Sequence, residues 1–95
     1  MIVQRILNIA ATIKNGRNSS QVFKYVIEEI GELATELNIE DGFSNKDPGD
    51  DGILGEAMDA IICLVDLIYI HQPGITEDEL TQICVNKLKK WKEKS

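Results

Sequence analysis

The stretch that decides the fold is residues 53–71, which read ILGEAMDAIICLVDLIYIH. Fourteen of the 18 residues in 53–70 are apolar, and this long run without a proline predicts a single helix. The apolar residues fall on every side of that helix, and a helix that is apolar all round has to be buried all round. Three other short helices can hardly cover it, so the pattern predicts a partner subunit against this helix.

Two helices are expected before this one. The first runs from about residue 2 to residue 15, and Gly16 is a plausible C-cap for it. The second follows residues 18–20, any of which can serve as its N-cap, and its apolar positions fill one arc of roughly 140°. Residues 40–52 combine turn formers with acids and therefore predict a long loop before the apolar helix.

A fourth helix is expected after the turn at residues 72–74. Thr76 and Glu79 have the spacing of a capping box, with Thr76 as N-cap. The helical spacing predicts that this last helix buries the side chains of Leu80, Ile83, Cys84, Leu88 and Trp91. The sequence as a whole predicts an all-α fold, in which residues 1–95 form one domain, a four-helix bundle-like subunit that assembles into a dimer or tetramer.

Charge is unevenly distributed along the chain. The net charge is −6, but residues 87–95 hold five lysines and one glutamate, which leaves −10 for residues 1–86. An acidic body argues against nucleic-acid binding, which depends on neutralising phosphates with basic groups. The acids within 53–70 argue against a membrane span. No secretory signal is visible, and Cys63 and Cys84 are expected to be reduced and buried, so we expect a cytoplasmic protein.

Acidic residues gather on one side of the second helix. Taking Glu29 as the zero of the helical wheel, Glu36 lies about 20° away, Glu32 about 60° and Glu28 about 100°. Like charges at i,i+4, such as Glu28 with Glu32, destabilise a helix by a few tenths of a kcal/mol. No lysine on this helix is placed to relieve the whole group.

A second acidic pair lies on the apolar helix. Glu56 and Asp59 are i,i+3 neighbours there, and Asp66 continues the stripe. Carboxylates on a buried helix are costly unless they are paired or metal-bound, and few basic residues precede position 87. Glu29, Glu32, Glu56 and Asp59 therefore predict an all-oxygen cage for Mg²⁺, for which Mn²⁺ can substitute.

These residues resemble a known pattern. Glu28-Glu29-Ile30-Gly31-Glu32, followed by Glu56-Ala57-Met58-Asp59, is similar to the EExxE…ExxD motif of MazG-like nucleotide pyrophosphohydrolases, and the likeness in helix order covers roughly residues 18–92. The resemblance implies a magnesium-dependent enzyme that hydrolyses an NTP or dNTP to the monophosphate and pyrophosphate. It places the metal on Glu29, Glu32, Glu56 and Asp59.

The resemblance also implies roles outside the metal cage. Lys87 matches a lysine early in the last helix that approaches the phosphates, and such proteins assemble as dimers or dimers of dimers. Glu28 is our candidate for orienting the attacking water, because it lies furthest round the wheel from the apolar arc. The chain departs from the pattern at Cys63, where relatives often have tyrosine, and at Trp91, where asparagine is common.

Two alternatives stay open. One is a phosphoribosyl-ATP pyrophosphohydrolase that uses the same acids. The other is a non-catalytic helical dimer that binds a metal or a partner protein. A di-iron carboxylate protein would need Glu-x-x-His pairs, and the single histidine, His71, is not placed to form one.

Overall fold

A computed structural model describes residues 1–43, 45–49 and 51–95. It contains four helices, α1 (Ile2–Thr12), α2 (Ser19–Glu40), α3 (Gly52–His71) and α4 (Glu77–Lys94), and no strand among the described residues. The predicted all-α class is confirmed. The long loop predicted over 40–52 begins after Glu40, and its positions 44 and 50 lie outside the described residues.

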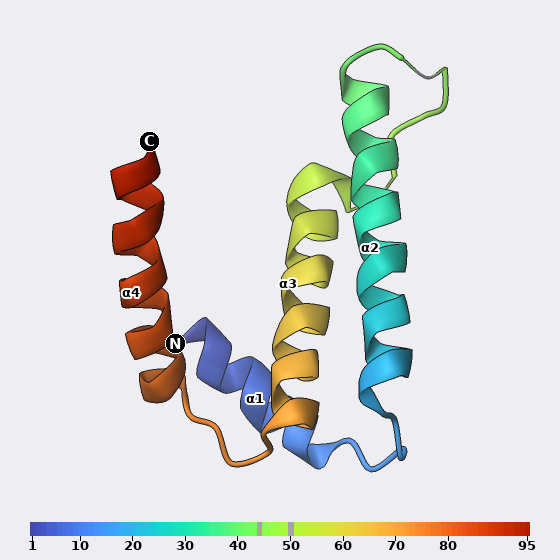
Figure 1. The fold of residues 1–95 in the computed structure, drawn as a ribbon. Helices are drawn as coiled ribbons and strands as arrows, with labels where there is room; N and C mark the ends of the chain where they lie inside the picture. Colours follow the sequence, from blue (N-terminus) through green and yellow to red (C-terminus); the bar gives the residue numbers. More distant parts are fainter. Residues whose placement is uncertain (44, 50) are drawn as a thin grey trace.

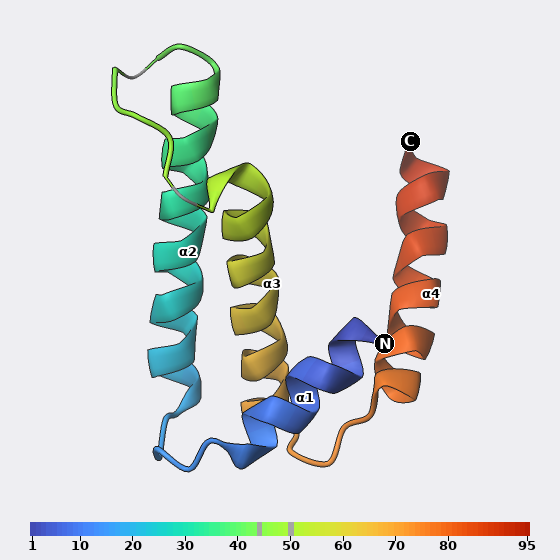
Figure 2. The same cartoon turned by 180° about the vertical axis from the view of Figure 1, so that it is seen from behind.

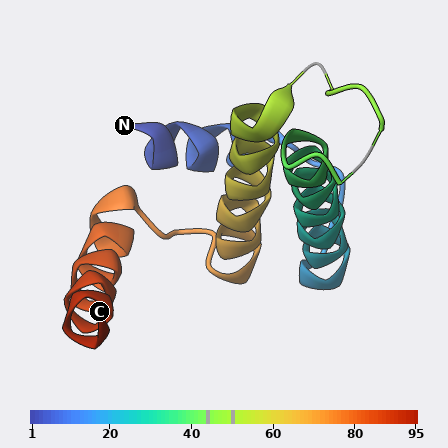
Figure 3. The same ribbon diagram turned by 90° about the horizontal axis from the view of Figure 1, so that it is seen from above.

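The helices α2 and α3 form an antiparallel pair, in which α3 lies in the middle of the molecule and α2 at one side (Figures 1 and 2). Helix α1 crosses beside the C-terminal half of α3, and α4 stands on the other side of α3 from α2 (Figure 3). Few side chains are buried in this arrangement, and the core consists of small and medium apolar residues: Leu7, Ala10, Val22, Val26, Ala60 and Val65. The packed part of the single chain is therefore α1, α2 and α3.

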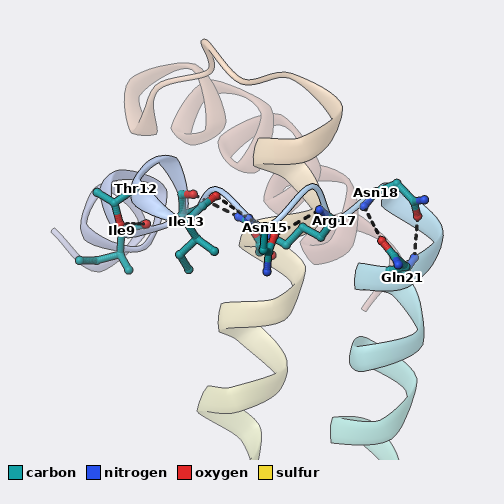
Figure 4. A network of polar contacts seen from close by, with 9 residues as sticks. Ile9, Thr12, Ile13, Asn15, Arg17, Asn18 and Gln21 are labelled. Atoms are coloured by element: carbon teal, nitrogen blue, oxygen red, sulfur yellow. Dashed lines mark hydrogen bonds and ion pairs between the residues drawn. The ribbon is translucent and has the colours of Figure 1, made fainter.

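The start of α2 follows from local hydrogen bonding. Asn18 is the N-cap: its side chain accepts a hydrogen bond from the Gln21 amide at 3.0 Å, and the Asn18 amide donates to the Gln21 side chain at 2.9 Å (Figure 4). This capping box satisfies two backbone groups that would otherwise lack partners. Of the three predicted N-cap candidates in 18–20, the structure therefore selects the first.

The end of α1 differs from the prediction. The helix stops at Thr12 and its C-cap is Ile13 in an extended conformation, so Gly16 is not the C-cap. Gly16 instead has φ +70° in the turn that leads to α2, a conformation that glycine adopts without steric cost. The predicted helix was about three residues too long because polar residues 14 and 15 do not break a helical pattern by themselves.

Arg17 fastens this turn to α3. Its guanidinium donates to both carboxylate oxygens of Asp66, at 2.8 Å and 2.7 Å, and also to the carbonyls of Ala10 and Ile13 at 3.1 Å and 2.9 Å. A bidentate arginine–carboxylate pair fixes both distance and orientation. Asp66, which continues the acidic stripe in the sequence, is therefore neutralised by Arg17 and holds α1 against α3.

The start of α4 was predicted correctly, although the capping differs in detail. Thr76 is the N-cap and its hydroxyl accepts a hydrogen bond from the Glu79 amide at 3.3 Å. The Glu79 carboxylate accepts from the Thr76 hydroxyl at 3.3 Å, whereas a full capping box would have it accept from the Thr76 amide. The helix is joined to α1 by Gln4 and Glu77, each of which accepts a hydrogen bond from the other's backbone amide.

The predicted burial of the α4 apolar face is wrong for the single chain. Leu80 is only half-buried, Cys84 is exposed, and Ile83, Leu88 and Trp91 are 49%, 48% and 68% exposed. The radius of gyration is 15.6 Å, against about 12 Å for a compact chain of this length. The apolar pattern was identified correctly, but the other described residues leave most of this face uncovered.

The apolar helix α3 is likewise left partly uncovered. Only Ala60 and Val65 are buried, while Leu54 is 86% exposed and Met58, Ile61, Ile62 and Leu64 are each about 40% exposed. The expectation that the other three helices cannot cover α3 is confirmed. In the part of the chain that the structure describes, no helix has both the length and the apolar character needed to cross a membrane.

Candidate metal site

Carboxylates from α2 and α3 converge between the two helices. One oxygen from each of Glu29, Glu32 and Glu56 lies within 4.8 Å of the others, and the same holds for Asp51, Glu56 and Asp59. Glu56 belongs to both groups and joins them. All four predicted metal ligands are thus brought into one acidic cluster, which we define as Glu29, Glu32, Asp51, Glu56 and Asp59.

Two oxygens of the cluster are buried without a partner. The Oε2 atoms of Glu29 and Glu56 are shielded from solvent and accept no hydrogen bond from the described residues. A buried acceptor that lacks a partner costs about 1–3 kcal/mol, and more when it is charged. These oxygens point to a positively charged ligand or to a proton in the space between the helices.

The pKa values of the two buried carboxyl groups, Glu56 and Glu29, are raised. Burial raises the pKa of Glu56 from 4.5 to about 7, and the neighbouring negative charges of Glu32, Asp59 and Glu29 add to the effect. Burial also raises the pKa of Glu29, again supported by nearby carboxylates. Repulsion among the carboxylates contributes to both raised pKa values, and a bound cation would remove this contribution.

The donor set fits a hard divalent cation. Every ligand that the cluster offers is a carboxylate oxygen, the donor that Mg²⁺ and Mn²⁺ prefer, and there is no histidine or cysteine in either group. The two buried, unpartnered oxygens are suitable for direct coordination. The four predicted ligands and Asp51 could therefore hold one or more such ions.

Asp51 was missed by sequence reasoning. It occupies the N-cap position of α3 but its side chain makes no capping hydrogen bond, and its backbone is in the right-handed helical region. The following Gly52 has φ +62°, and Gly55 lies so close that an added Cβ would be 2.5 Å from the Asp51 Cβ. The signal in the sequence was its position: Asp51 directly precedes the apolar helix and stands five residues before Glu56.

A second acid, Glu36, shapes the loop that carries Asp51. Glu36 is 8% exposed, and its Oε1 accepts a hydrogen bond from the Gly49 amide at 2.7 Å. A Cβ at position 49 would lie 2.5 Å from that oxygen, so a larger residue there would have to displace the Glu36 carboxylate. Glu36 therefore extends the acidic side of α2 without joining the cluster, and fixes the loop two residues before Asp51.

The Glu36–Gly49 contact can be tested through stability. Glu36→Ala should lower the free energy of unfolding by about 1–3 kcal/mol, because the Gly49 amide loses its acceptor in a partly buried setting. Glu40→Ala, at an exposed position of the same helix, should change it by less than about 0.5 kcal/mol. Chemical denaturation measures both, and equal effects would show that the contact does not stabilise the loop.

The other predicted site residues lie outside the cluster. Glu28 is exposed on α2, where its charge contributes to the raised pKa of Glu29. Lys87 lies on α4 and lines a groove with Val65 and Ile68 of α3. Within the single chain, the structure therefore brings the four predicted metal ligands together and leaves Lys87 apart from them.

Cys63 lies on the same side of α3 as Glu56 and Asp59, one turn beyond Asp59. It is half-buried, and burial together with the nearby carboxylates raises the pKa of its thiol. The Cys63 side chain is thus a neutral, weakly polar group. It borders a cavity of about 260 Å³ between α1 and α3, whose lining is mostly aliphatic: Ile6, Ile9, Ala10, Ile13 and Ile62.

The fold and the site define an all-α protein with a carboxylate cluster between two antiparallel helices. Comparisons with protein-family models, with curated proteins and with solved structures found no match to this chain. The chemistry of the acidic cluster and of its surroundings is therefore the basis for a functional assignment.

Proposed function

We propose that this protein is a magnesium-dependent nucleoside triphosphate pyrophosphohydrolase, which cleaves an NTP or dNTP to the monophosphate and pyrophosphate. The observation that carries the proposal is the acidic cluster, with its two buried and unpartnered carboxylate oxygens. An acidic protein that handles a polyanionic substrate needs a cation between its own charges and the phosphates. The resemblance to the EExxE…ExxD pattern supports the same assignment.

The cluster residues have distinct parts in this proposal. Glu29, Glu32, Glu56 and Asp59 hold the cation, and Asp51 adds a ligand from the loop. A bound Mg²⁺ would neutralise negative charge on the phosphate oxygens as pyrophosphate leaves. Glu28, exposed beside the cluster, orients the attacking water.

The cavity between α1 and α3 supports a nucleotide rather than inorganic pyrophosphate as substrate. It continues the side of α3 that carries Glu56, Asp59 and Cys63, and its walls are largely apolar. A flat, weakly polar nucleobase suits such walls, since ligand pockets are mostly apolar with a few placed polar groups. We assign the phosphates to the cluster and the base to this cavity.

The proposal includes assembly. Helices α3 and α4 expose more large apolar side chains than a soluble monomer usually does. Large exposed apolar patches mark interaction sites. We therefore propose a homodimer or homotetramer in which α3 lies at the interface. We place it in the cytoplasm, away from membranes and nucleic acid.

A product assay tests the chemistry. Each NTP and dNTP, together with phosphoribosyl-ATP, is incubated with the protein and Mg²⁺, and the products are separated by ion-exchange chromatography. At least one should yield its monophosphate and pyrophosphate, and EDTA should stop the reaction. A diphosphate with orthophosphate would mean that a different bond is cleaved. Inertness toward every compound would favour the non-catalytic alternative.

A further inference from the structure

Arg5 and Asp66 are the charged side chains that line the cavity of about 260 Å³ between α1 and α3. Asp66 is already engaged, because its two carboxylate oxygens accept hydrogen bonds from Arg17 at 2.8 Å and 2.7 Å. Arg5 makes no side-chain hydrogen bond or ion pair with the described residues. Of the two charged groups, only the Arg5 guanidinium is therefore available to a ligand, and a guanidinium donates hydrogen bonds but cannot accept them.

Among the described residues no carboxylate pairs with Arg5, although the surrounding chain is acidic. Residues 1–86 carry a net charge of −10 and hold five of the ten basic side chains. Arg5 is exposed and also lines the cavity, so its guanidinium lies at the rim. A planar guanidinium in that position keeps a fork of N–H donors for a ligand that presents two acceptors side by side.

The other side chains that line the cavity supply no strong acceptor. Five of them are aliphatic, and Cys63 contributes a thiol, which is only a weak donor and a weak acceptor. An amino group turned toward these walls would lose its hydrogen bonds to water without replacement. A flat ring with acceptor atoms on one edge suits this lining, because Arg5 can satisfy the acceptors while the aliphatic walls contact the ring faces.

The size and position of the cavity suit the base of a nucleotide. Pockets for whole drug-sized ligands measure roughly 300–1,000 Å³, so a cavity of about 260 Å³ holds a base but not the sugar and phosphates as well. Cys63 lines the cavity and is four residues beyond Asp59 on α3, which is about 6 Å along the helix axis. A base in the cavity can therefore have its sugar and phosphates directed toward the acidic cluster.

The bases differ in how their acceptors are arranged. Guanine and hypoxanthine present the acceptors O6 and N7 side by side, and arginine binds this pair with two parallel hydrogen bonds. Adenine has an amino group in place of O6, so one donor would face another. In cytosine the adjacent acceptors O2 and N3 are followed by an amino group, for which the lining side chains have no strong acceptor. Uracil and thymine have no two adjacent acceptors.

We propose that Arg5 recognises the O6 and N7 atoms of a 6-oxopurine, so that the preferred substrates are the triphosphates of guanine or hypoxanthine nucleosides. The choice of substrate rests on the proposed function. The contact between Arg5 and the base stands on the cavity and its lining, and it can be measured without catalysis.

Substrate competition tests the choice of base. Wild-type kcat/KM should be about 10- to 100-fold higher for GTP and ITP than for ATP, the size of one bidentate contact. In Arg5→Gln the preference should be lost or reversed, because a glutamine amide matches N6 and N7 of adenine. Lys14→Gln is the matched control: it removes the same charge from an exposed position outside the cavity, and should keep the wild-type preference. An equal loss for all nucleotides in Arg5→Gln, or a wild type that prefers ATP or CTP, would overturn the proposal.

A single-atom change in the substrate tests the contact itself. 7-Deaza-GTP lacks the N7 acceptor and should be about 10-fold poorer than GTP for the wild type. For Arg5→Gln the two nucleotides should be nearly equal, since the cycle of side-chain and atom deletions isolates their coupling. The same 7-deaza effect in both proteins would show that Arg5 does not contact N7.

Nucleoside binding separates this inference from the proposed function. Inosine and adenosine carry no phosphate, so their binding in EDTA, measured by ligand-observed NMR, requires neither metal nor hydrolysis. The wild type and Lys14→Gln should bind inosine about 10-fold more tightly than adenosine, and Arg5→Gln should not. This result in a protein that hydrolyses no nucleotide would remove the proposed function and support the base contact. Hydrolysis without any Arg5-dependent preference for inosine would leave the proposed function standing and overturn the inference.

Discussion

Replacing Glu56 by glutamine should remove most of the stabilisation that Mg²⁺ confers, and should lower catalytic activity at least about 100-fold. Divalent cation binds the folded site, so at 100 times its Kd it should stabilise the wild-type protein by about 2.7 kcal/mol. For a domain of this size that corresponds to a rise in melting temperature of roughly 10–20 °C. Because Glu56 belongs to both carboxylate groups, no other single residue should matter as much.

Without metal, the Glu56→Gln protein should be as stable as the wild type or more so. Glutamine keeps the shape of the side chain and removes one negative charge from a crowded site. Glu40→Gln, outside the cluster at the end of α2, is the matched control and should show the full wild-type response to Mg²⁺. Thermal melts of the three proteins with and without Mg²⁺ provide the comparison. If both variants respond alike, Glu56 is not a ligand.

Glu56 should also make the stability of the metal-free protein depend on pH. Its pKa is raised from 4.5 to about 7 in the folded protein, so the folded state binds a proton that the unfolded state releases. The resulting stability is fully present below pH 4.5 and is lost as pH rises through about 7. Metal-free wild type should therefore lose stability between these values relative to Glu56→Gln. Mg²⁺ affinity should rise over the same range, because the ion has to displace that proton.

Much of the site could be predicted because its residues lie at helical spacing. Glu29 and Glu32 share a face of α2, Glu56 and Asp59 share a face of α3, and the short chain leaves few ways to pack two such helices. Local rules decide such placements, and the structure brings the four side chains together as expected. The helix starts at Asn18 and Thr76 could be predicted for the same reason, since capping is local.

The features that could not be predicted depend on contacts distant in sequence or on special backbone angles. The Arg17–Asp66 pair joins residues 49 positions apart, and no periodicity relates them. Asp51 joins the cluster from the loop end, directly before Gly52 with its positive φ, and no helical spacing relates it to the ligands on α2. The exposure of α4 has another cause: an apolar pattern indicates that a face will be covered, but it does not identify which chain covers it.

Ile61→Asp should convert the assembled protein into a monomer. Ile61 is 43% exposed in the single chain and lies on the same side of α3 as Val65, which lines the groove facing α4. In the monomer an aspartate there stays hydrated, so the helical content measured by circular dichroism should be retained. In the assembly the same charge is buried among apolar side chains without a partner, which costs about 3–5 kcal/mol and weakens association by roughly 100- to 1,000-fold or more.

Light scattering at micromolar concentration measures the difference. Wild type should have the mass of a dimer or tetramer, and the Ile61→Asp protein that of one 10.6 kDa chain. Asn8→Asp is the matched control, because it adds one negative charge at an exposed position of α1 where the side chain can still accept the hydrogen bond from Gln4. It should assemble as wild type does. A monomeric wild type, or an Ile61→Asp protein that assembles normally, would show that this side of α3 is not the interface.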